Sequence, residues 1–565
     1  MLSRPEWFES SWWLSRLASR WALLAAIGIA AYAVFLRCWH LFNPHNYYVL
    51  SADSYFFHWL ARRIMAGEGP PPDMRSGAIY TLYTGLAYPL AYIAKAVESV
   101  FNLSSAESLD IVCKFVPPLL GIISMVILYL VVRRIWNRKV GLFSALAWAA
   151  ILYAVFVGAA GYIDRDGLSM LLIMLGALAF YLSKGWHFKV GSRDLGWVVA
   201  ALVVLCMEAL LYLEWTFMGP LLLLVVIVVY FLVKFLFSYI GLGNTEQLVV
   251  TRLKGAAREA NWLAFAAIII VNIVVIALSQ GATSWLVLTT GLVQAQGNIQ
   301  VEELRGLSLE TLLFSYGFFL IPIAFGLYVA WKKRSDGAIF FTCWFLSLLI
   351  LSLFASRVLF FATPAAAVLS GLGLAFLWDW RGGGQYQMWK KVGVAVLLVL
   401  LILVSSSMVP SMGLSSLNAV DEEWQDALTY LRQETPQDAL IMTQWGWGFW
   451  ILDLGQRKPV MDNGFYGYDD QRMHDVGVSY VTTDPSEAVQ MMRKYNAGYL
   501  IFSKLDLNFT GIIMGWAGLD VKADAFPEDS LVARTLSGEF ESGGGLEVVY
   551  RSVPQGEVVI LGLTN

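Results

Sequence analysis

The amino-acid sequence predicts a polytopic α-helical membrane protein with about 11 to 13 transmembrane helices and a C-terminal soluble domain of mixed α/β type. Of its 565 residues, 58% are hydrophobic and only 14% are charged, and the mean hydropathy is +0.62. Soluble globular proteins are about half apolar and about a quarter charged. A further observation is a change after Ser407, where long apolar runs give way to segments of ordinary polarity.

Apolar runs of about 20 residues, the length that spans a bilayer, supply the predicted helices. The first run follows a basic and aromatic stretch and is interpreted as an anchor, not as a cleavable signal peptide. The predicted spans are 22–39, 111–132, 140–160, 168–183, 197–213, 217–238, 262–279, 312–331, 338–354, 358–378 and 392–409.

The sequence also predicts how the chain divides into domains. Residues 410–565 alternate helix-like and strand-like segments, over a length typical of one soluble domain. We therefore expect a membrane domain over 1–409 and a separate C-terminal domain over 410–565. Two long outer loops are expected within the membrane domain, at 40–110 and 281–311.

Clusters of Lys and Arg in the short loops predict the orientation of the helices. With the spans above, all six clusters fall on one side, which the positive-inside rule makes the cytoplasmic side. Residues 79–100 are apolar enough to span, but a span there would move the later basic loops to the other side. We expect them to lie on, or re-enter, the outer face. The C-terminal domain is then outside, together with Asp53, Asp164, Asp166, Glu302, Glu303 and Arg357.

The outer carboxylates suggest one common site, because spanning a membrane does not require them. Oxygen atoms of Asp and Glu are suitable ligands for Mg²⁺ or Mn²⁺. Such an ion can neutralise the charge that builds on a phosphate leaving group. Taken singly, each acid has the alternative interpretation that it only solvates a loop. Their shared side favours a divalent-cation site, whereas a transporter would more often place ionisable residues within its spans.

Two further segments each have more than one interpretation. Arg357 opens a span at the outer face, where it would hold a phosphate by paired hydrogen bonds or act as an interfacial anchor. The segment Gln444–Trp450 reads Gln-Trp-Gly-Trp-Gly-Phe-Trp and follows an apolar, strand-like run. Its rings would contact a peptide or a sugar from a surface loop. Alternatively they would pack in an aromatic core or lie at the membrane interface.

Taken in order, these segments resemble the catalytic subunit of oligosaccharyltransferase in its single-subunit archaeal or bacterial form. This family has an Asp in the first outer loop, which Asp53 matches. It has an Asp-x-Asp motif in the second outer loop, which Asp164 and Asp166 match. It also has a Glu in a later, flexible outer loop, and Glu303 is favoured over Glu302 because Leu follows it.

The resemblance continues into the last third of the chain. An Arg opens a late span of the family and Pro soon follows, as Arg357 and Pro364 do here. The family carries Trp-Trp-Asp-Tyr-Gly in its C-terminal domain, for recognition of the acceptor peptide. The corresponding residues here are Gln444, Trp445, Gly446, Trp447 and Gly448.

The resemblance implies a GT-C type fold and a specific reaction. An oligosaccharide would pass from a polyprenyl-linked phosphate or pyrophosphate carrier to an asparagine of an acceptor protein. Mn²⁺ or Mg²⁺ would be held by Asp53, Asp164, Asp166 and Glu303, and Arg357 would bind the lipid phosphate. Asp53 and Glu303 would act as catalytic residues by also engaging the acceptor carboxamide.

The resemblance further implies the setting of this reaction. The enzyme would be a single subunit that crosses the plasma membrane many times, with its site and C-terminal domain outside the cytoplasm. Its partners would be the lipid-linked donor, the acceptor polypeptide and membrane lipid, and it would bind no nucleic acid.

The sequence departs from the family at the acceptor motif, where Gln444 replaces the first Trp and Gly446 replaces the Asp. Loss of a carboxylate that accepts a hydroxyl proton would weaken recognition by about 1–3 kcal/mol. The departure leaves room for relaxed Asn-x-Ser/Thr specificity, or for a related glycosyltransferase that acts on a hydroxyl or lipid acceptor. A non-enzymatic transporter is a further alternative, for which Glu208 and Glu214 are the candidate intramembrane acids.

Overall fold

The structure is a computed structural model, and its contacts divide the chain into two compact units. Unit 1 comprises Met1–Pro44, Phe115–Ala160 and Arg165–Leu414, and unit 2 comprises His45–Lys114, Gly161–Asp164 and Ser415–Asn565. The predicted span 262–279 and the acids Glu302 and Glu303 lie outside the described residues. The described residues are 10–42, 52–68, 85–182, 189–190, 193–194, 196–215, 218–239, 306–379, 386–411, 420–462, 470–519 and 524–564.

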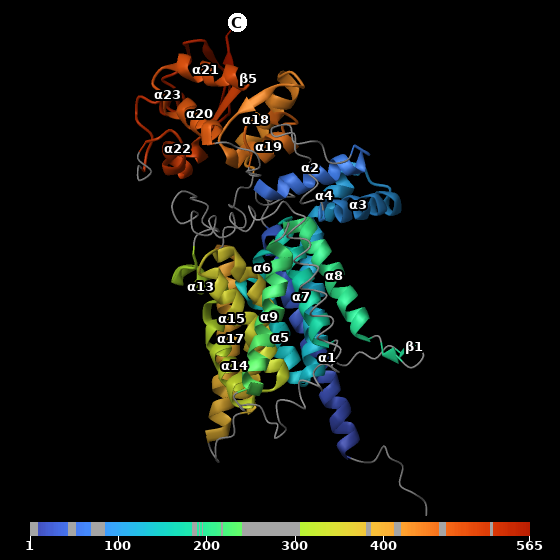
Figure 1. Ribbon diagram of the computed structural model, residues 1–565. Coiled ribbons are helices and arrows are strands. Elements are labelled where there is room, and N and C mark those ends of the chain that lie inside the picture. The colour runs from blue at the N-terminus through green and yellow to red at the C-terminus, as the bar shows by residue number, and fades with distance from the viewer. Residues whose placement is uncertain are drawn as a thin grey trace, which may run out of the picture. The chain divides into compact units, whose positions relative to one another are not determined.

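Unit 1 is built from helices, apart from a small antiparallel hairpin of β1 (Lys189–Val190) and β2 (Arg193–Asp194) (Figure 1). α4 (Ser105–Ile135) begins in unit 2 and continues into unit 1. The other helices in the described part of unit 1 are α1 (Ser10–Cys38), η2 (Trp39–Phe42), α5 (Arg138–Ala150), α6 (Leu152–Phe156), α7 (Arg165–Leu182), α8 (Gly196–Trp215), α9 (Met218–Tyr239), α13 (Leu309–Tyr316), η5 (Gly317–Phe319), α14 (Leu320–Lys333), α15 (Asp336–Ser352), η6 (Ser356–Ala362), α16 (Thr363–Asp379) and α17 (Tyr386–Ser411).

Within the described residues, seven helical stretches are long and apolar enough to cross a membrane. Two shorter apolar helices, Ala201–Leu211 and Asp336–Ser352, accompany them. The seven stretches are Arg20–Cys38, Ser105–Ile135, Arg165–Leu182, Gly219–Phe237, Leu309–Lys333, Ser356–Asp379 and Lys391–Val409. Each of these nine helical segments overlaps one of the spans predicted from hydropathy.

α16 is the most deeply buried helix of these seven stretches, since its apolar window is buried entirely. It packs against α14 and α5, and glycines allow the close approach to α14. A Cβ atom added at Gly326 would lie 2.0 Å from the Leu369 carbonyl oxygen. One added at Gly373 would lie 2.0 Å from the Pro322 carbonyl oxygen. Small residues bring membrane helices into backbone contact in this way.

The predicted span 140–160 differs from the structure, because two helices occupy it. Between α5 and α6, Ile151 is extended, with φ −63° and ψ 124°. Such a break releases carbonyl groups from helical hydrogen bonding, and buried carbonyls need donors. The fully buried Arg37 guanidinium supplies them at 2.9–3.4 Å, donating to the carbonyl oxygens of Trp148, Ala149 and Ala154.

Unit 2 combines two helices of the predicted first outer loop with the C-terminal part of the chain. α2 (Ala52–Met65) packs against α3 (Ala87–Phe101), which lies within the apolar residues 79–100. The C-terminal elements are α18 (Glu422–Glu434), β3 (Leu440–Met442), η7 (Trp445–Trp447), α19 (Gly448–Asp453), β4 (Lys458–Pro459), α20 (Asp470–Val481), α21 (Pro485–Lys494), β5 (Ala497–Ser503), η8 (Lys504–Phe509), α22 (Thr510–Trp516), α23 (Leu531–Ser537), β6 (Ser542–Gly543), β7 (Leu546–Arg551) and β8 (Val558–Leu563).

The strands form one mixed sheet in the order β4-β3-β5-β8-β7-β6. The pairs of β3 with β4 and with β5 are parallel, and the remaining pairs are antiparallel. β8 reads Val-Val-Ile-Leu-Gly-Leu and is buried along most of its length, which is typical of a strand covered on both faces. η7 and α19 follow the carboxyl end of β3, so the sheet presents the predicted acceptor segment.

Candidate functional site

Asp53 lies in the first turn of α2, where the N-terminal end of the helix dipole stabilises a carboxylate. Residues 54–61, which follow it, are all buried, whereas Asp53 itself is half-buried. The helix is therefore fixed by packing while its first acid stays at the margin of the packed region.

Asp164 follows a turn that requires glycine. Gly161 has a φ of +79°, and its N–H donates to the Lys114 carbonyl oxygen at 3.0 Å. Asp164 is buried, with 6% of its surface exposed, and the Tyr162 hydroxyl lies 3.5 Å from its Oδ2. A buried carboxylate needs polar or cationic partners, and the predicted cation would be one of them.

Asp166 and Arg357 are two predicted site residues that the structure brings together. Asp166 lies in the first turn of α7, and Arg357 lies in η6. The Arg357 Nη2 is 3.2 Å from Oδ2 and 3.4 Å from Oδ1 of Asp166. The Asp166 side chain is 2% exposed and that of Arg357 is 15% exposed, so water screens the pair little.

The predicted metal ligands stay a prediction. Among the residues described, no group of three or more His, Cys, Asp and Glu gathers closely enough to hold a metal ion. Glu303, one of the predicted ligands, is outside those residues. The oxygen donors of Asp53 and Asp164 are of the type that Mg²⁺ and Mn²⁺ prefer, whereas Asp166 is already paired with Arg357.

The predicted acceptor segment is mostly buried. Gln444, Gly446, Trp447 and Gly448 are buried, and Trp445 alone among its five residues is half-buried. The Trp447 indole packs 4.7 Å from the ring of Trp450. The Trp447 ring therefore packs in the interior of unit 2, as the aromatic-core interpretation expects, and recognition of a peptide by this segment stays a prediction.

Gln444 holds the turn that carries this segment. Its side-chain Oε1 accepts a hydrogen bond from the Gly446 N–H at 2.6 Å. A Cβ atom added at Gly446 would lie 2.8 Å from the Gln444 Nε2. The amide of Gln444 thus occupies the space that a side chain at position 446 would enter.

A buried acid that sequence reasoning missed lies beside this segment. Asp506, in η8, accepts hydrogen bonds from the Trp447 indole at 2.6 Å and from the Ser503 N–H at 2.8 Å. Burial raises the pKa of Asp506 to about 7, although these donors and the Gln444 and Tyr480 side chains act in the other direction. In the sequence, Leu-Asp-Leu gives no sign that Asp506 bonds the acceptor segment, since Trp447 lies 59 positions away.

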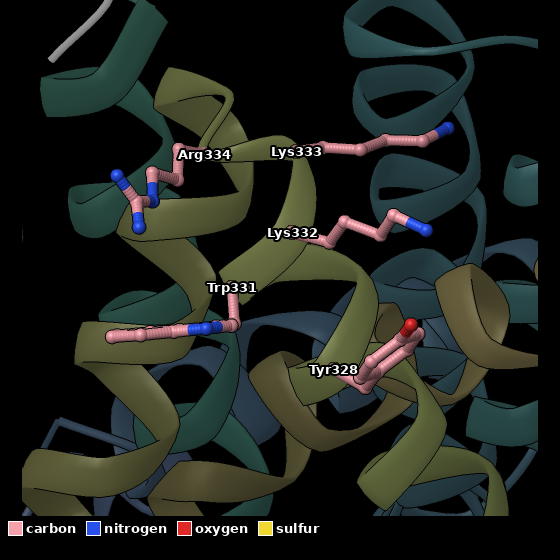
Figure 2. A pocket seen from close by; sticks show the side chains of 5 residues that line it. All are labelled: Tyr328, Trp331, Lys332, Lys333 and Arg334. Atoms are coloured by element: carbon pink, nitrogen blue, oxygen red, sulfur yellow. The ribbon is translucent and has the colours of Figure 1, made fainter. Parts of the chain in front are cut away.

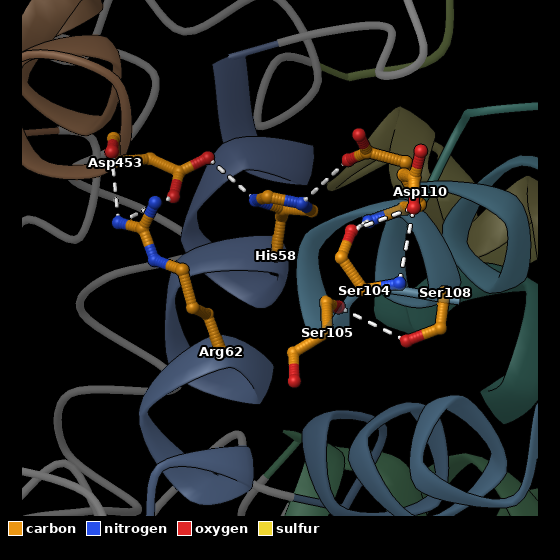
Figure 3. A network of polar contacts seen from close by, with 8 residues as sticks. His58, Arg62, Ser104, Ser105, Ser108, Asp110 and Asp453 are labelled. Atoms are coloured by element: carbon orange, nitrogen blue, oxygen red, sulfur yellow. Dashed lines mark hydrogen bonds and ion pairs between the residues drawn. The ribbon is translucent and has the colours of Figure 1, made fainter. Parts of the chain in front are cut away.

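A second network that the sequence did not reveal is centred on His58 (Figure 3). Its Nδ1 lies 2.7 Å from Asp453 Oδ2, and its Nε2 lies 3.1 Å from Asp110 Oδ1. Arg62, one turn further along α2, pairs with the other oxygen of Asp453 at 3.0 Å. Burial opposes the charged imidazole, but the carboxylates of Asp453 and Asp110 outweigh it and raise the pKa of His58 to about 9.

A cavity of about 420 Å³ at the C-terminal end of α14 is lined by aromatic and basic side chains (Figure 2). In Figure 2 they diverge, with Arg334 and Trp331 extending to one side and the others to the opposite side. Lys332, Lys333 and Arg334 form one of the six basic clusters predicted to face the cytoplasm, so this cavity is not a candidate for the outer site. Its lining residues are Tyr328, Trp331, Lys332, Lys333 and Arg334.

The chain is similar in sequence to known glycosyltransferases. No protein-family model matches the chain. The chain is 22% identical over 613 aligned residues to dolichyl-phosphooligosaccharide-protein glycotransferase 1 of Pyrococcus furiosus, an alignment that covers 94% of this chain and 60% of the relative. The chain is homologous to the oligosaccharyltransferases. A further match of 23% identity, to subunit STT3B of the Arabidopsis thaliana glycosyltransferase, covers 36% of this chain and 33% of the relative.

Comparison with solved structures gives the fold of this oligosaccharyltransferase homologue. The crystal structure of the Archaeoglobus fulgidus oligosaccharyltransferase in its apo form matches with a TM-score of 0.71 at 14% identity, over 97% of this chain and 80% of that one. ArnT of Cupriavidus metallidurans bound to undecaprenyl phosphate matches with a TM-score of 0.53 at 12% identity, over 96% and 98%. The predicted GT-C type fold is confirmed, as is the predicted resemblance.

The homologue therefore shares the architecture of these enzymes, while it spans less than two thirds of the length of either curated relative. Its predicted acceptor segment is held from within by Gln444 and Asp506, and His58 joins α2 to α19. The catalytic roles of the predicted residues follow from this architecture only as a proposal.

Proposed function

We propose that this homologue transfers an oligosaccharide from a polyprenyl-linked phosphate or pyrophosphate to the side-chain amide of asparagine in acceptor polypeptides. The similarity to the Pyrococcus furiosus glycotransferase over 94% of the chain carries this proposal. The Archaeoglobus fulgidus enzyme has been solved with a dolichol-phosphate and an inhibitory peptide, and tethered to an acceptor peptide with an NVT sequon. We extend these two ligand classes, lipid phosphate and peptide, to the present chain.

Arg357 is the proposed ligand of the donor phosphate. A guanidinium presents paired N–H donors that match the oxygens of a carboxylate or a phosphate. Its contact with Asp166 at 3.2 Å supports this role, since the carboxylate orients the guanidinium and balances its charge in a buried setting. The donor phosphate would accept hydrogen bonds from this guanidinium.

Asp53 is the proposed partner of the acceptor carboxamide, together with Glu303. An amide nitrogen is a poor nucleophile because its lone pair is conjugated with the carbonyl group. Carboxylates that accept its N–H hydrogen bonds reduce this conjugation and can take the proton. The amide nitrogen then forms a bond to the anomeric carbon of the sugar, the bond from that carbon to the phosphate oxygen breaks, and the phosphate leaves with the electron pair.

A divalent cation is proposed at the same site. Asp53, Asp164 and Glu303 would hold Mn²⁺ or Mg²⁺, with Asp166 as a ligand or as support through Arg357. When bound, the ion would neutralise negative charge on the departing phosphate. The Archaeoglobus fulgidus oligosaccharyltransferase, solved with Zn and sulfate, supports a metal in the family but does not identify the physiological ion here.

The proposed location is the extracytoplasmic face of the plasma membrane, with the enzyme acting as a single subunit. The homologue is a multi-span membrane protein, and the six basic clusters on one side of its spans support this orientation.

The decisive experiment measures glycan transfer to paired fluorescent peptides, one with Asn-x-Thr and one with Asn-x-Ala. The full-length protein is assayed in nanodiscs with lipid-linked oligosaccharides extracted from its own source cells, with Mn²⁺ and with chelator. We expect metal-dependent transfer to the Asn-x-Thr peptide, and a loss of at least about 100-fold in rate for Asp53→Asn. Absence of transfer to either peptide by the wild-type protein would refute the proposed function.

A hydroxyl or lipid acceptor is the second candidate, favoured by the glycine at position 446 in place of the family's acid. It predicts that serine-containing peptides without asparagine, or a lipid, accept the glycan. The same assay separates the two candidates by the chemistry of the product, because only an amide-linked glycan is released by an amidase specific for Asn-linked sugars.

A further inference from the structure

Two elements of the proposed acceptor site are joined within unit 2 by rings as well as by charges. α2 carries Asp53 in its first turn, and α19 follows the acceptor segment directly. The Tyr55 and Trp450 rings meet edge to face at 6.3 Å, and those of Phe56 and Phe449 lie 5.0 Å apart. Apolar rings resist separation but permit small sliding, so they do not by themselves fix how far one helix lies along the other.

The His58 network supplies directional contacts at the same junction. Asp453, the last residue of α19, is 0% exposed and receives His58 on one oxygen and Arg62 on the other. The Arg62 Nη2 also donates to the Asp453 backbone carbonyl at 2.8 Å, which binds the guanidinium to the end of α19 itself. Asp110, near the start of α4, holds the opposite side of the imidazole at 3.1 Å. Figure 3 shows the imidazole between the two carboxylates.

Charges in this network balance when the imidazole is protonated. Two carboxylates, Asp453 and Asp110, then face two cations, His58 and Arg62. A buried charge that loses its partner costs far more free energy than an exposed one. Protonated His58 donates at both ring nitrogens, whereas a neutral imidazole donates at only one. A further titratable group beside this network is the Cys113 thiol of α4, which interacts with both carboxylates.

We propose that His58 is a positioning residue, which sets α2, and with it Asp53, relative to the acceptor segment Gln444–Gly448. His58 lies five residues after Asp53, about 7.5 Å along the helix axis. Asp453 lies five residues after Gly448 on the partner element. The ion pair therefore fixes the distance between the acid that engages the acceptor amide and the segment that holds the peptide. This inference rests on the proposed function.

The test compares peptide binding with donor binding in steady-state kinetics. His58→Gln keeps a polar side chain of similar reach but removes the cation. We expect it to raise the KM for the Asn-x-Thr peptide at least about tenfold, with the donor KM within about twofold of the wild-type value. Arg63→Gln is the matched control on the same helix, because Arg63 pairs with the exposed Glu68, and it should leave both values unchanged.

A double-mutant cycle shows whether the effect passes through Asp453. Asp453→Asn alone should resemble His58→Gln, and the double variant should be much less impaired than the product of the two single effects. Asp110→Asn replaces His58→Gln in the kinetic test if the latter variant does not fold. The Asp110 side chain is 31% exposed, and its replacement leaves the contact between His58 and Asp453 intact. It should raise the peptide KM by a smaller factor, about two- to fivefold.

The outcomes separate failure of this inference from failure of the proposed function. The inference alone is overturned if the wild-type protein is active and both variants, His58→Gln and Asp110→Asn, keep its peptide KM. In that case the variants would lose only kcat, in proportion to the fraction of protein that is folded. Equal increases in the peptide and donor KM values would also overturn it. A wild-type protein that transfers no glycan to peptide would refute the proposed function first, and the positioning role with it.

Discussion

At the scale of single residues, position 446 determines which side chains the acceptor segment can carry. Gln444 and Gly446 are coupled, because the Gln444 Oε1 bonds the Gly446 N–H and its amide fills the adjoining space. Restoring the family's acid at position 446 therefore requires a change at position 444 as well. A substitution at position 446 alone would change the stability of the protein and the recognition of the peptide at the same time, so the two effects could not be separated.

The coupling predicts the behaviour of two variants. Gly446→Asp should destabilise the protein by about 1–3 kcal/mol, because the Gln444 amide must leave its hydrogen bond and a buried carboxylate is added. Gln444→Ala combined with Gly446→Asp should recover part of that loss, since the shorter side chain vacates the space. Thermal unfolding in one detergent measures both variants. Equal unfolding midpoints for the single and double variants would contradict the coupling.

At the scale of secondary-structure elements, the break between α5 and α6 depends on one buried cation. Arg37 donates to carbonyl oxygens on both sides of the break, and two glycines leave room for its side chain. A Cβ atom added at Gly121 would lie 2.6 Å from the Arg37 Nε, and one at Gly158 would lie 2.7 Å from it. Hydropathy cannot reveal such a break, because both short helices are as apolar as one long span.

A larger residue at one of the two glycines beside Arg37 should therefore destabilise unit 1. Gly121→Ala should lower the free energy of unfolding by about 1–3 kcal/mol, because the added methyl group displaces the guanidinium from its carbonyl acceptors. Gly28→Ala is the matched control, since it lies on α1 with Arg37 and its added Cβ would meet no atom within 4 Å. Thermal unfolding of both variants gives the comparison. A loss of equal size in the control would refute the role of Arg37.

At the scale of the whole molecule, two buried groups make stability depend on pH in the same direction. The pKa of Asp506 rises from its ordinary 3.8 to about 7 through burial, and that of His58 rises from 6.5 to about 9 despite burial, through Asp453 and Asp110. In both cases the folded state binds protons more tightly than the unfolded chain. The stabilisation contributed by these two groups is therefore greatest at low pH and is lost as the pH rises through each folded pKa.

Thermal unfolding between pH 4 and pH 10 should show two separate declines. Asp506→Asn should flatten the decline between pH 4 and pH 7, and His58→Gln the decline between pH 6.5 and pH 9. Asp438→Asn, at an exposed turn before β3, should leave the profile unchanged. If both declines persist in both variants, other groups carry the pH dependence.

The sequence predicted the parts of this molecule that depend on local pattern. Hydropathy identified the membrane helices because lipid imposes the same length and polarity on every span. Short motifs led to the prediction of Asp53, Asp166 and Arg357 as site residues, and the structure places each of them near the start of a helical element. These motifs could not show that Asp166 and Arg357 pair, because the contact joins residues 191 positions apart.

What the sequence did not predict depends on contacts between distant segments. The two partners of His58 lie 52 and 395 positions away, and Trp447 lies 59 positions from Asp506. A buried acid cannot be distinguished from a solvated acid in the sequence, because burial depends on the residues that pack around it in the folded protein. The sequence left Trp447 open between a surface loop and an aromatic core, because the rings that pack on it belong to residues both before and after it in the chain, such as Trp424 and Phe509.

The three indoles of Trp424, Trp447 and Trp450 stand 4.7–5.4 Å apart at the back of the acceptor segment. Chromophores at this separation, held in a fixed chiral arrangement, couple their electronic transitions and contribute a band to the circular dichroism spectrum. The acceptor segment thus contains its own optical probe. A peptide that displaced α19 would alter this band without any label, so occupancy of the site would be visible spectroscopically before any sugar is transferred.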